Sequence, residues 1–402
     1  MAHFTYEGRQ KTGKRVNGKI SSSSKHAAML TLRDKGIKIS KIEELPQTIW
    51  NKDLTIGNPV KLQDFVIFLR QFSTLLQAGV SVVETVHVLG GQTSSKALAS
   101  ALHVVEEDLR GGISLSEASS KHKKVFPSIY VNMVRAGEIG GNLDETLERL
   151  AVHFEKQNHT MQKIKSALAY PIVVGILAIG VIIFLLTSVV PTFAEMFADF
   201  GGELPAITQF VLGASEWMQR FWWLILLLVV LLVVSIMVIR KNKDSKYFLD
   251  YAILKTPIFG KILQKAMIAR MTRTLSSLFS SSVPVLQAIS IVEKVVENEV
   301  LVRVLKNARD SLESGESLTT PMQKHWVFPP LVTQMIAIGE KTGALDAMLA
   351  KVADFYETEV DNATESLKSL IEPLMIVLLA GIVGVIVLAI MVPMFEIFNQ
   401  IN

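Results

Sequence analysis

Three oxygen-bearing side chains in the first half of the chain could together hold a metal ion. Glu84, Glu138 and Asn142 offer carboxylate and amide oxygens, which are the kinds of ligand that calcium prefers in proteins. The corresponding stretches of the second half keep a carboxylate only at Glu340. A calcium site is therefore a hypothesis for the first half alone.

An ion pair with an arginine is the simpler role for the repeated glutamates. Glu138 and Glu340 each fall near the C-terminal end of a predicted helix, where the helix dipole disfavours an anion by roughly 0.3–1 kcal/mol. Arg70 and Arg273 are repeated along the chain in the same way. The pattern favours an Arg70–Glu138 pair and an Arg273–Glu340 pair, and it leaves calcium as the alternative in the first half.

A glycine-rich stretch near the N-terminus has the spacing of a phosphate-binding loop. Residues 13–19 read GKRVNGK and satisfy the pattern G-x-x-x-x-G-K. Such a loop also requires Ser or Thr at the next position, a strand before it and a helix after it. Ile20 follows instead, and the surrounding residues are typical of a β-hairpin. We therefore expect no nucleotide site here.

The composition gives no support to other enzyme classes. The 402 residues include no cysteine, which excludes disulfides, thiolate metal sites and cysteine nucleophiles. The 8 histidines are scattered, and neither H-E-x-x-H nor G-x-S-x-G occurs. The net charge of +4 is too small to indicate direct binding of nucleic acid. Nothing in the sequence indicates a catalytic constellation, and we expect no required cofactor.

The motif around Glu138 occurs twice. Residues 135–147 read RAGEIGGNLDETL, and residues 337–349 read AIGEKTGALDAML. Other stretches match at nearly the same spacing, such as VVPTF (189–193) with MVPMF (391–395). The repeated motif residues are Gly137, Glu138 and Gly141 in the first half and Gly339, Glu340 and Gly343 in the second. The chain is therefore interpreted as a duplicated helical domain, each copy followed by an apolar helix.

Three apolar stretches are long enough to cross a membrane. Each has 19 residues and no ionisable side chain, namely Ile172–Val190, Phe221–Ile239 and Leu374–Val392, and a helix of that length spans about 28 Å. Residues 191–220 carry four acidic residues and one arginine, whereas residues 240–246 carry four basic ones. By the positive-inside rule, residues 1–170 and 240–372 are expected in the cytoplasm.

These observations predict an all-α membrane protein with two repeated six-helix cytoplasmic bundles, three transmembrane helices and a small N-terminal β-α-β module. Asn142 and Glu145 indicate an N-terminal helix cap, as do Ser81 and Glu84. Pro171 and Pro373 are expected to mark helix boundaries, with a hinge as the alternative. The predicted order is module 1–45, linker 46–59, first bundle 60–170, transmembrane helix 171–191, extracytoplasmic loop 192–220, transmembrane helix 221–239, second bundle 240–372, transmembrane helix 373–393 and extracytoplasmic tail 394–402.

The sequence resembles the inner-membrane platform proteins of type IV pilus and type II secretion machines, the GspF/PilC family. The resemblance covers nearly the whole chain and rests on YEGR (6–9), LRQFSTLLQAGVSVVETV (69–86), MVRAGE (133–138), Tyr170-Pro171 and the complete second copy. It implies two cytoplasmic helical bundles, three transmembrane helices and no enzymatic activity. Family members can also carry calcium in the first cytoplasmic domain, where Asn142 departs from the acidic residue expected.

The same resemblance implies the partners. They are a hexameric cytoplasmic ATPase, pilins or pseudopilins that are extracted into a growing fibre, other inner-membrane assembly components, membrane lipid and further copies of the chain. A polytopic transporter or channel component is the alternative function. Intramembrane charges are typical of transport pathways, and the three apolar stretches contain none.

Overall fold

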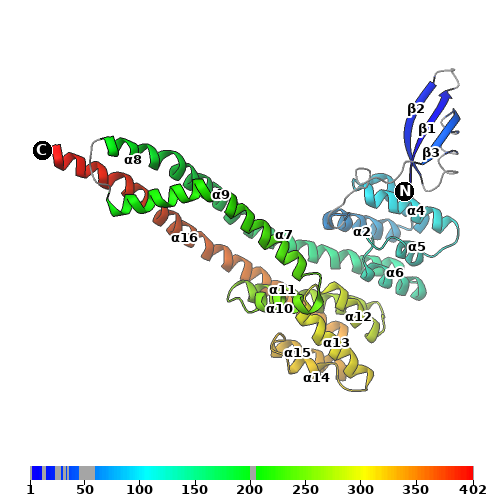
Figure 1. Ribbon diagram of the computed structural model, residues 1–402. Coiled ribbons are helices and arrows are strands. Elements are labelled where there is room, and N and C mark those ends of the chain that lie inside the picture. The colour runs from blue at the N-terminus through cyan, green and yellow to red at the C-terminus, as the bar shows by residue number, and fades with distance from the viewer. Residues whose placement is uncertain are drawn as a thin grey trace. The chain divides into compact units, whose positions relative to one another are not determined.

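The computed structural model describes residues 2–10, 15–22, 29, 33, 36–44, 59–199 and 205–401. The chain divides into two compact units, residues 1–59 and residues 60–402. Figure 1 shows strands in the first unit and helices in the second. Each unit is described by itself.

The N-terminal unit contains a three-stranded antiparallel sheet. β1 (Ala2–Gln10) lies in the centre and pairs with β2 (Arg15–Ser22) and β3 (Ile37–Glu44). The predicted hairpin and strand are thereby confirmed. The predicted helix before Gly36 and the linker 46–59 lie almost entirely outside the described residues.

Residues 15–19 of the glycine-rich stretch belong to this sheet. Gly18 pairs with Tyr6 and Lys19 pairs with Thr5 inside β2. A phosphate-binding loop would need a helix to begin here, so that its N–H groups could point at a phosphate. Here the backbone is extended and paired with β1 instead.

The first bundle has six helices, as predicted. Ser81 Oγ accepts the N–H of Glu84 at 3.3 Å at the start of the second helix, so this predicted cap is confirmed. Aromatic rings from α2, α6, α7 and the turn before α6 meet in the centre, where Phe65 contacts Phe126, Tyr130 and Phe154. The helices are α2 (Leu62–Gln77), α3 (Val82–Gln92), α4 (Lys96–Arg110), α5 (Leu115–Ser120), α6 (Ser128–Gly140) and α7 (Leu143–Phe184).

The second bundle repeats these six helices and adds one that was not predicted, α10 (Lys243–Leu254). α10 is held by Lys246, which donates to the Glu297 carbonyl at 2.7 Å, and by Arg303, whose guanidinium lies 4.1 Å from the centre of the Tyr247 ring. The repeated helices are α11 (Phe259–Ser280), α12 (Val285–Val295), α13 (Glu299–Glu313), α14 (Thr319–Gln323), α15 (Pro330–Thr342) and α16 (Leu345–Ile401).

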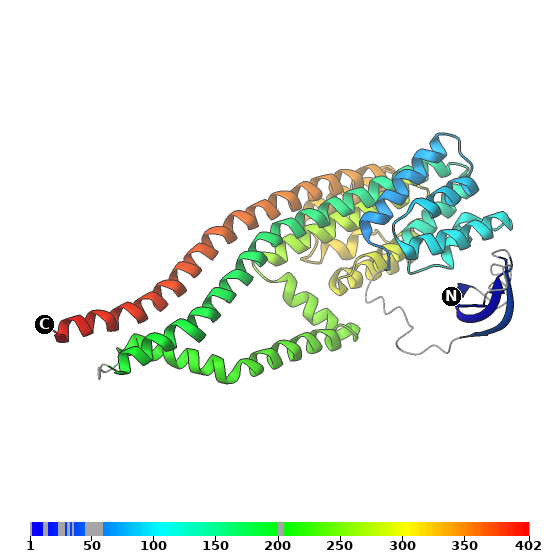
Figure 2. The ribbon, with the colours of Figure 1, turned by 90° about the horizontal axis from the view of Figure 1, so that it is seen from above.

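The last helix of each bundle continues into an apolar stretch. α7 is followed by a π-helical turn, η2 (Leu185–Val189), and by α8 (Val190–Asp199), and α16 runs on without interruption. α7 and α16 lie side by side as they leave the bundles (Figure 2). Together with α9 (Ala206–Ile239), these runs supply three helices long and apolar enough to cross a membrane. The predicted transmembrane helices are thereby confirmed as helices.

The prolines do not end these helices. Pro171 and Pro373 both lie inside continuous helix, so the predicted boundaries at these positions are wrong. A π-helical turn falls just before Pro191, a position where the missing N–H of proline leaves the carbonyl four residues earlier without its helical partner.

The segment predicted as an extracytoplasmic loop is largely helical. α8 extends to Asp199, and α9 begins at Ala206 and bends at Phe221, where the second transmembrane helix was expected to begin. The early part of α9 packs on the two other apolar helices. The buried Thr208 hydroxyl donates to the Ala389 carbonyl at 2.7 Å, and Val211 packs with Val190, Ile386 and Ala389.

Deleting residues 1–59 should leave the helical unit folded, because the two units have separate cores. The melting temperature of the shortened chain in detergent, followed by circular dichroism at 222 nm, should match that of the full chain. A deletion to residue 77 is the matched control, since it removes Phe65, Phe68 and Phe72 from the first core. Loss of helical signal in the shorter deletion would contradict the division.

Candidate functional site

The repeated motif turns the chain from the fifth helix of each bundle into the last one. Gly141 and Gly343 have φ values of +71° and +70°, a left-handed conformation that favours glycine. The N–H of Asn142 reaches back to the Gly137 carbonyl at 3.1 Å, and the same bond recurs to Gly339 at 3.0 Å. This is the Schellman arrangement, which satisfies carbonyls at a helix end.

Gly137 and Gly339 allow the two helices to approach closely at this turn. A Cβ added to Gly137 would lie 2.7 Å from Thr146 Oγ1, and one added to Gly339 would lie 3.0 Å from the Cα of Leu345. Each glycine therefore lets α6 or α15 pack against the first turn of the following helix. Asn142 occupies the N-cap position of α7, but its side chain makes no capping hydrogen bond. That predicted cap is wrong, because its backbone closes the turn instead.

The repeated glutamates cap a neighbouring helix. Glu138 Oε1 accepts the N–H of Leu115 at 2.6 Å and that of Ser116 at 3.3 Å. The N–H groups at the start of a helix lack partners within it, and the helix dipole there favours an anion. Glu138 thus satisfies the first turn of α5 from across the bundle.

Glu340 plays the same part in the second bundle. It accepts the N–H of Leu318 at 3.0 Å and the hydroxyl proton of Ser317 at 2.6 Å, just before α14. The predicted Arg70–Glu138 and Arg273–Glu340 pairs are therefore wrong. A helix N-terminus lies nearer to each carboxylate than the arginine does, and it supplies the positive partner.

Arg70 instead joins the first helix of its bundle to the last one. Its Nε and Nη2 donate to the two carboxylate oxygens of Glu155 at 2.7 Å, and its Nη1 donates to Glu148 at 2.6 and 2.7 Å. These hydrogen bonds, with that to Glu155 the stronger cause, raise the pKa of Arg70. The hydrogen bond with Arg70 lowers the pKa of Glu148.

Arg273 makes the equivalent connection in the second bundle, with Glu357 at 2.8 and 2.9 Å and with Asp354. Burial opposes its charged form, but the hydrogen bonds with Glu357 and Asp354 outweigh burial and raise the pKa of Arg273. Its side chain is 13% exposed, against 38% for Arg70. The difference arises because α7 of the first bundle lies over the second cluster.

The sequence contained a signal for half of these partners. Phe154-Glu155 recurs as Tyr356-Glu357 in the alignment of the two copies, so a repeated carboxylate accompanies each repeated arginine. The other carboxylates, Glu148 and Asp354, occupy different turns of α7 and α16. The repeat could not identify them.

The calcium candidates are not assembled into a cage. Glu84 lies in the first turn of α3, which packs on α2 and α4, whereas Glu138 lies on α6, which packs on α5 and α7. The Glu138 carboxylate is already bound to two N–H groups. Throughout the described part of the chain, no group of three or more His, Asp or Glu side chains is placed to hold a metal ion. The calcium site therefore stays a hypothesis.

The two bundles meet along α7 and α16, through an ion-paired contact that we call the inter-bundle contact. Lys156 bonds Asp354 at 2.6 Å and lies 3.2 Å from Glu357. One heptad further along both helices, Lys163 pairs with Asp361. Positive charges on the first copy thus meet negative charges on the second, in a parallel register. A pair of this kind at a half-exposed position contributes about 0.2–1 kcal/mol.

A buried histidine completes this contact. His153 is 3% exposed, and its Nδ1 lies 3.3 Å from Ser277 Oγ, which donates its own proton to the Arg273 carbonyl. The ring therefore donates its Nδ1–H to Ser277. Burial, assisted by the positive charges of Arg273 and Arg270, lowers the pKa of His153 to about 3.

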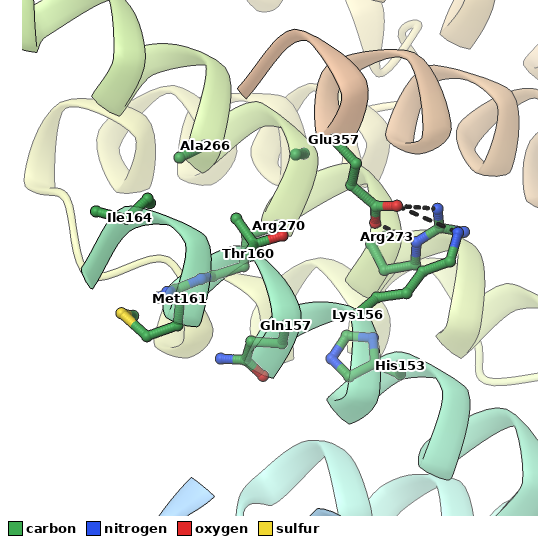
Figure 3. A pocket seen from close by; sticks show the side chains of 11 residues that line it. His153, Lys156, Gln157, Thr160, Met161, Ile164, Ala266, Arg270, Arg273 and Glu357 are labelled. Atoms are coloured by element: carbon green, nitrogen blue, oxygen red, sulfur yellow. Dashed lines mark hydrogen bonds and ion pairs between the residues drawn. The ribbon is translucent and has the colours of Figure 1, made fainter. Parts of the chain in front are cut away.

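A cavity of about 60 Å³ lies within the inter-bundle contact. Figure 3 shows its lining side chains, which come from α7, α11 and α16. They are His153, Lys156, Gln157, Thr160, Met161, Ile164, Ala266, Ala269, Arg270, Arg273 and Glu357. The Glu357 carboxylate shown there is ion-paired with Lys156 and Arg273. The arrangement is suited to holding helices together and to binding a small polar molecule.

Two family profiles match the chain. The profile of type II secretion system (T2SS) protein F matches twice, at residues 68–191 and 271–393, which are the two copies with their apolar helices. The profile of the type II secretion system protein F N-terminal domain matches residues 1–43. The duplication and the N-terminal module were thus correctly identified.

Three curated relatives are similar over at least 96% of their length. The type IV pilus assembly protein PilC of Thermus thermophilus is 39% identical, with 100% of each chain covered. PilC of Myxococcus xanthus is 35% identical, with 100% of this chain and 96% of the relative covered. Type II secretion system protein F of Vibrio cholerae is 30% identical, with 100% of each chain covered.

Replacing Glu138 or Glu340 by Gln should lower the free energy of unfolding of the full chain by about 1–2 kcal/mol, because each change weakens a helix cap. Thermal melts in detergent would measure it. If Glu138 acts only as a cap, the loss is the same with calcium and with chelator. A calcium-dependent rise in melting temperature that Glu138→Gln abolishes and Glu340→Gln preserves would contradict this and establish the calcium site.

Acidification should weaken the protein through His153. Its folded pKa of about 3 lies below the ordinary value of 6.5, so the unfolded chain takes up a proton first. Stability is therefore fully present above about pH 6.5 and is lost as the pH falls towards 3, by on the order of 2 kcal/mol at pH 5.

Melting temperatures at pH 7.5 and pH 5 would test this. His153→Gln should reduce the loss of melting temperature between pH 7.5 and pH 5. His159→Gln, at an exposed position, should leave that loss unchanged. Burial also lowers the pKa values of His122 and His325, so both residues contribute to the slope that remains. Equal slopes in the wild type and His153→Gln would refute the assignment.

Proposed function

The chain belongs to the type II secretion system protein F family, and on that basis we propose that it is a non-enzymatic inner-membrane platform that couples a cytoplasmic hexameric ATPase to assembly of pilins or pseudopilins. The observation that carries the proposal is the similarity to both kinds of relative over the entire chain. The two type IV pilus relatives are 39% and 35% identical and the type II secretion relative is 30% identical. This favours a type IV pilus machine, with type II secretion as the second candidate.

The unbroken helices suggest how such a platform would transmit force. α7 and α16 extend from the bundle cores into their apolar stretches without a break at Pro171 or Pro373. The arginine clusters fix each helix to the first helix of its bundle. An ATPase that displaced a bundle would therefore move the attached membrane helix, and with it any pilin bound beside that helix.

The proposed partners are the ATPase, pilins or pseudopilins, other inner-membrane assembly components, membrane lipid and further copies of the chain. No cofactor is required in this proposal, and calcium enters only if the melts described above reveal it. A transporter or channel is the competing function. Ion flux through liposomes that contain the purified chain would favour that competitor.

The proposed topology places residues 1–170 and 240–372 in the cytoplasm, with the N-terminus inside and the C-terminus outside. It rests on the charge asymmetry around the apolar stretches. Because the chain has no cysteine, single cysteines can report on each side. A membrane-impermeant maleimide applied to intact cells should label Glu203→Cys and spare Ser314→Cys until the cells are lysed. Labelling of position 314 in intact cells would reverse the topology.

Complementation would test the function. In a Thermus thermophilus strain that lacks its own PilC, expression of this chain should restore surface pili, counted by electron microscopy. An equally expressed chain truncated before α16 is the matched control, because it lacks the third apolar helix. Membrane-inserted expression without pili, together with rescue of secretion in a Vibrio cholerae strain lacking protein F, would move the assignment to type II secretion.

A further inference from the structure

One cation in the inter-bundle contact has no ion-pair partner among the described residues. Lys156 and Arg273 are balanced by Asp354 and Glu357. The nearby pairs Lys163–Asp361 and Lys265–Glu359 are balanced as well. Within the described ranges, no hydrogen bond or ion pair engages the guanidinium of Arg270. The contact therefore carries an uncompensated positive charge.

This cation lines the cavity together with uncommitted hydrogen-bonding groups. Gln157 and Thr160 line the cavity from α7, and Arg270 lines it from α11 (Figure 3). Neither the Gln157 amide nor the Thr160 hydroxyl bonds any other described residue. Met161, Ile164, Ala266 and Ala269 form apolar walls, which lower the local dielectric constant and so strengthen electrostatic attraction.

We propose that this cavity binds a phosphate-type oxyanion between Arg270 of the second copy and Gln157 and Thr160 of the first. A guanidinium matches two oxygens of a phosphate or sulfate group, and the hydroxyl and amide can donate to the others. The volume of about 60 Å³ exceeds the roughly 10–15 Å³ that one water molecule requires, so the cavity has room for one small anion group. The acidic side chains near the cavity, Asp354 and Glu357, are ion-paired with Lys156 and Arg273.

The site is specific to the junction of the two copies. In the alignment of the repeats, Ile67 occupies in the first copy the place that Arg270 has in the second. One anion per chain would bridge α7 and α11 and so strengthen the inter-bundle contact.

The source of this anion is either free phosphate or a phospholipid headgroup. Ile164 lies eight residues before Ile172, about 12 Å along the helix from the first apolar stretch, and basic pockets at this depth can bind lipid headgroups.

Titration of inorganic phosphate into the purified full-length chain would test the site. The experiment uses detergent solution at constant ionic strength, with chloride as the reference anion, and follows both calorimetric heat and melting temperature. We expect one saturable site per chain and a rise in melting temperature with phosphate. Arg270→Gln should weaken binding at least tenfold, and Arg270→Lys should restore part of it. Arg135→Gln, which removes an exposed arginine on α6, is the matched control and should bind as the wild type does.

A second arm distinguishes the two sources. The chain is reconstituted into nanodiscs of phosphatidylglycerol or of phosphatidylcholine, without free phosphate. An increase in melting temperature in phosphatidylglycerol that Arg270→Gln abolishes and Arg135→Gln preserves identifies a headgroup. Saturation by phosphate in detergent identifies the free anion. The proposal is overturned if the wild type responds to neither source, or if Arg270→Gln responds as the wild type does.

Discussion

A helix cannot leave backbone groups unpaired within the apolar layer of a membrane, because each unpaired group costs several kcal/mol there. α7 and α16 meet this constraint by running unbroken from the bundle cores into apolar stretches. The other helices of each bundle are organised around them. The glycine turn, the carboxylate cap and the arginine cluster all fix a neighbouring helix to this continuous one or to the helix that leads into it.

Duplication has placed the same chemical groups in two different environments. Arg70 remains at a half-exposed surface, whereas its counterpart Arg273 is covered by α7 of the other copy. Lys156 also reaches into the second cluster, and its partner Asp354 has a pKa that the bonds to Lys156 and Arg273 lower against the effect of burial. The second cluster therefore joins two bundles, while the first joins helices within one bundle.

The contact between the bundles differs in chemistry from their interiors. The first bundle has an aromatic centre, whereas the contact contains ion pairs, a neutral buried histidine and a cavity. Ion pairs at half-exposed positions contribute little net stability, and salt screens them. Such a contact sets the register of the two helices but contributes little to the free energy of their association. It is therefore the place in the helical unit where a bound anion or a change of pH would act most directly.

Composition and local pattern were enough for much of the architecture. An uninterrupted apolar stretch can be stable only as a membrane helix or a wholly buried one, and the repeated Gly-Glu motif revealed the duplication. Left-handed turns at Gly141 and Gly343 also follow from local chemistry. These features depend on residues that are neighbours in the sequence, so the sequence by itself determined them.

Tertiary structure decided which charged groups meet. Glu138 was expected beside Arg70, yet it caps α5, while Arg70 binds carboxylates 78 and 85 residues away. His153 gave no signal, because its burial depends on α11 of the other copy. A side chain finds its partner through the approach of helices that are distant in the chain, and each helix end, carboxylate and guanidinium has several partners of the right charge. Only the packing of the helices selects among them.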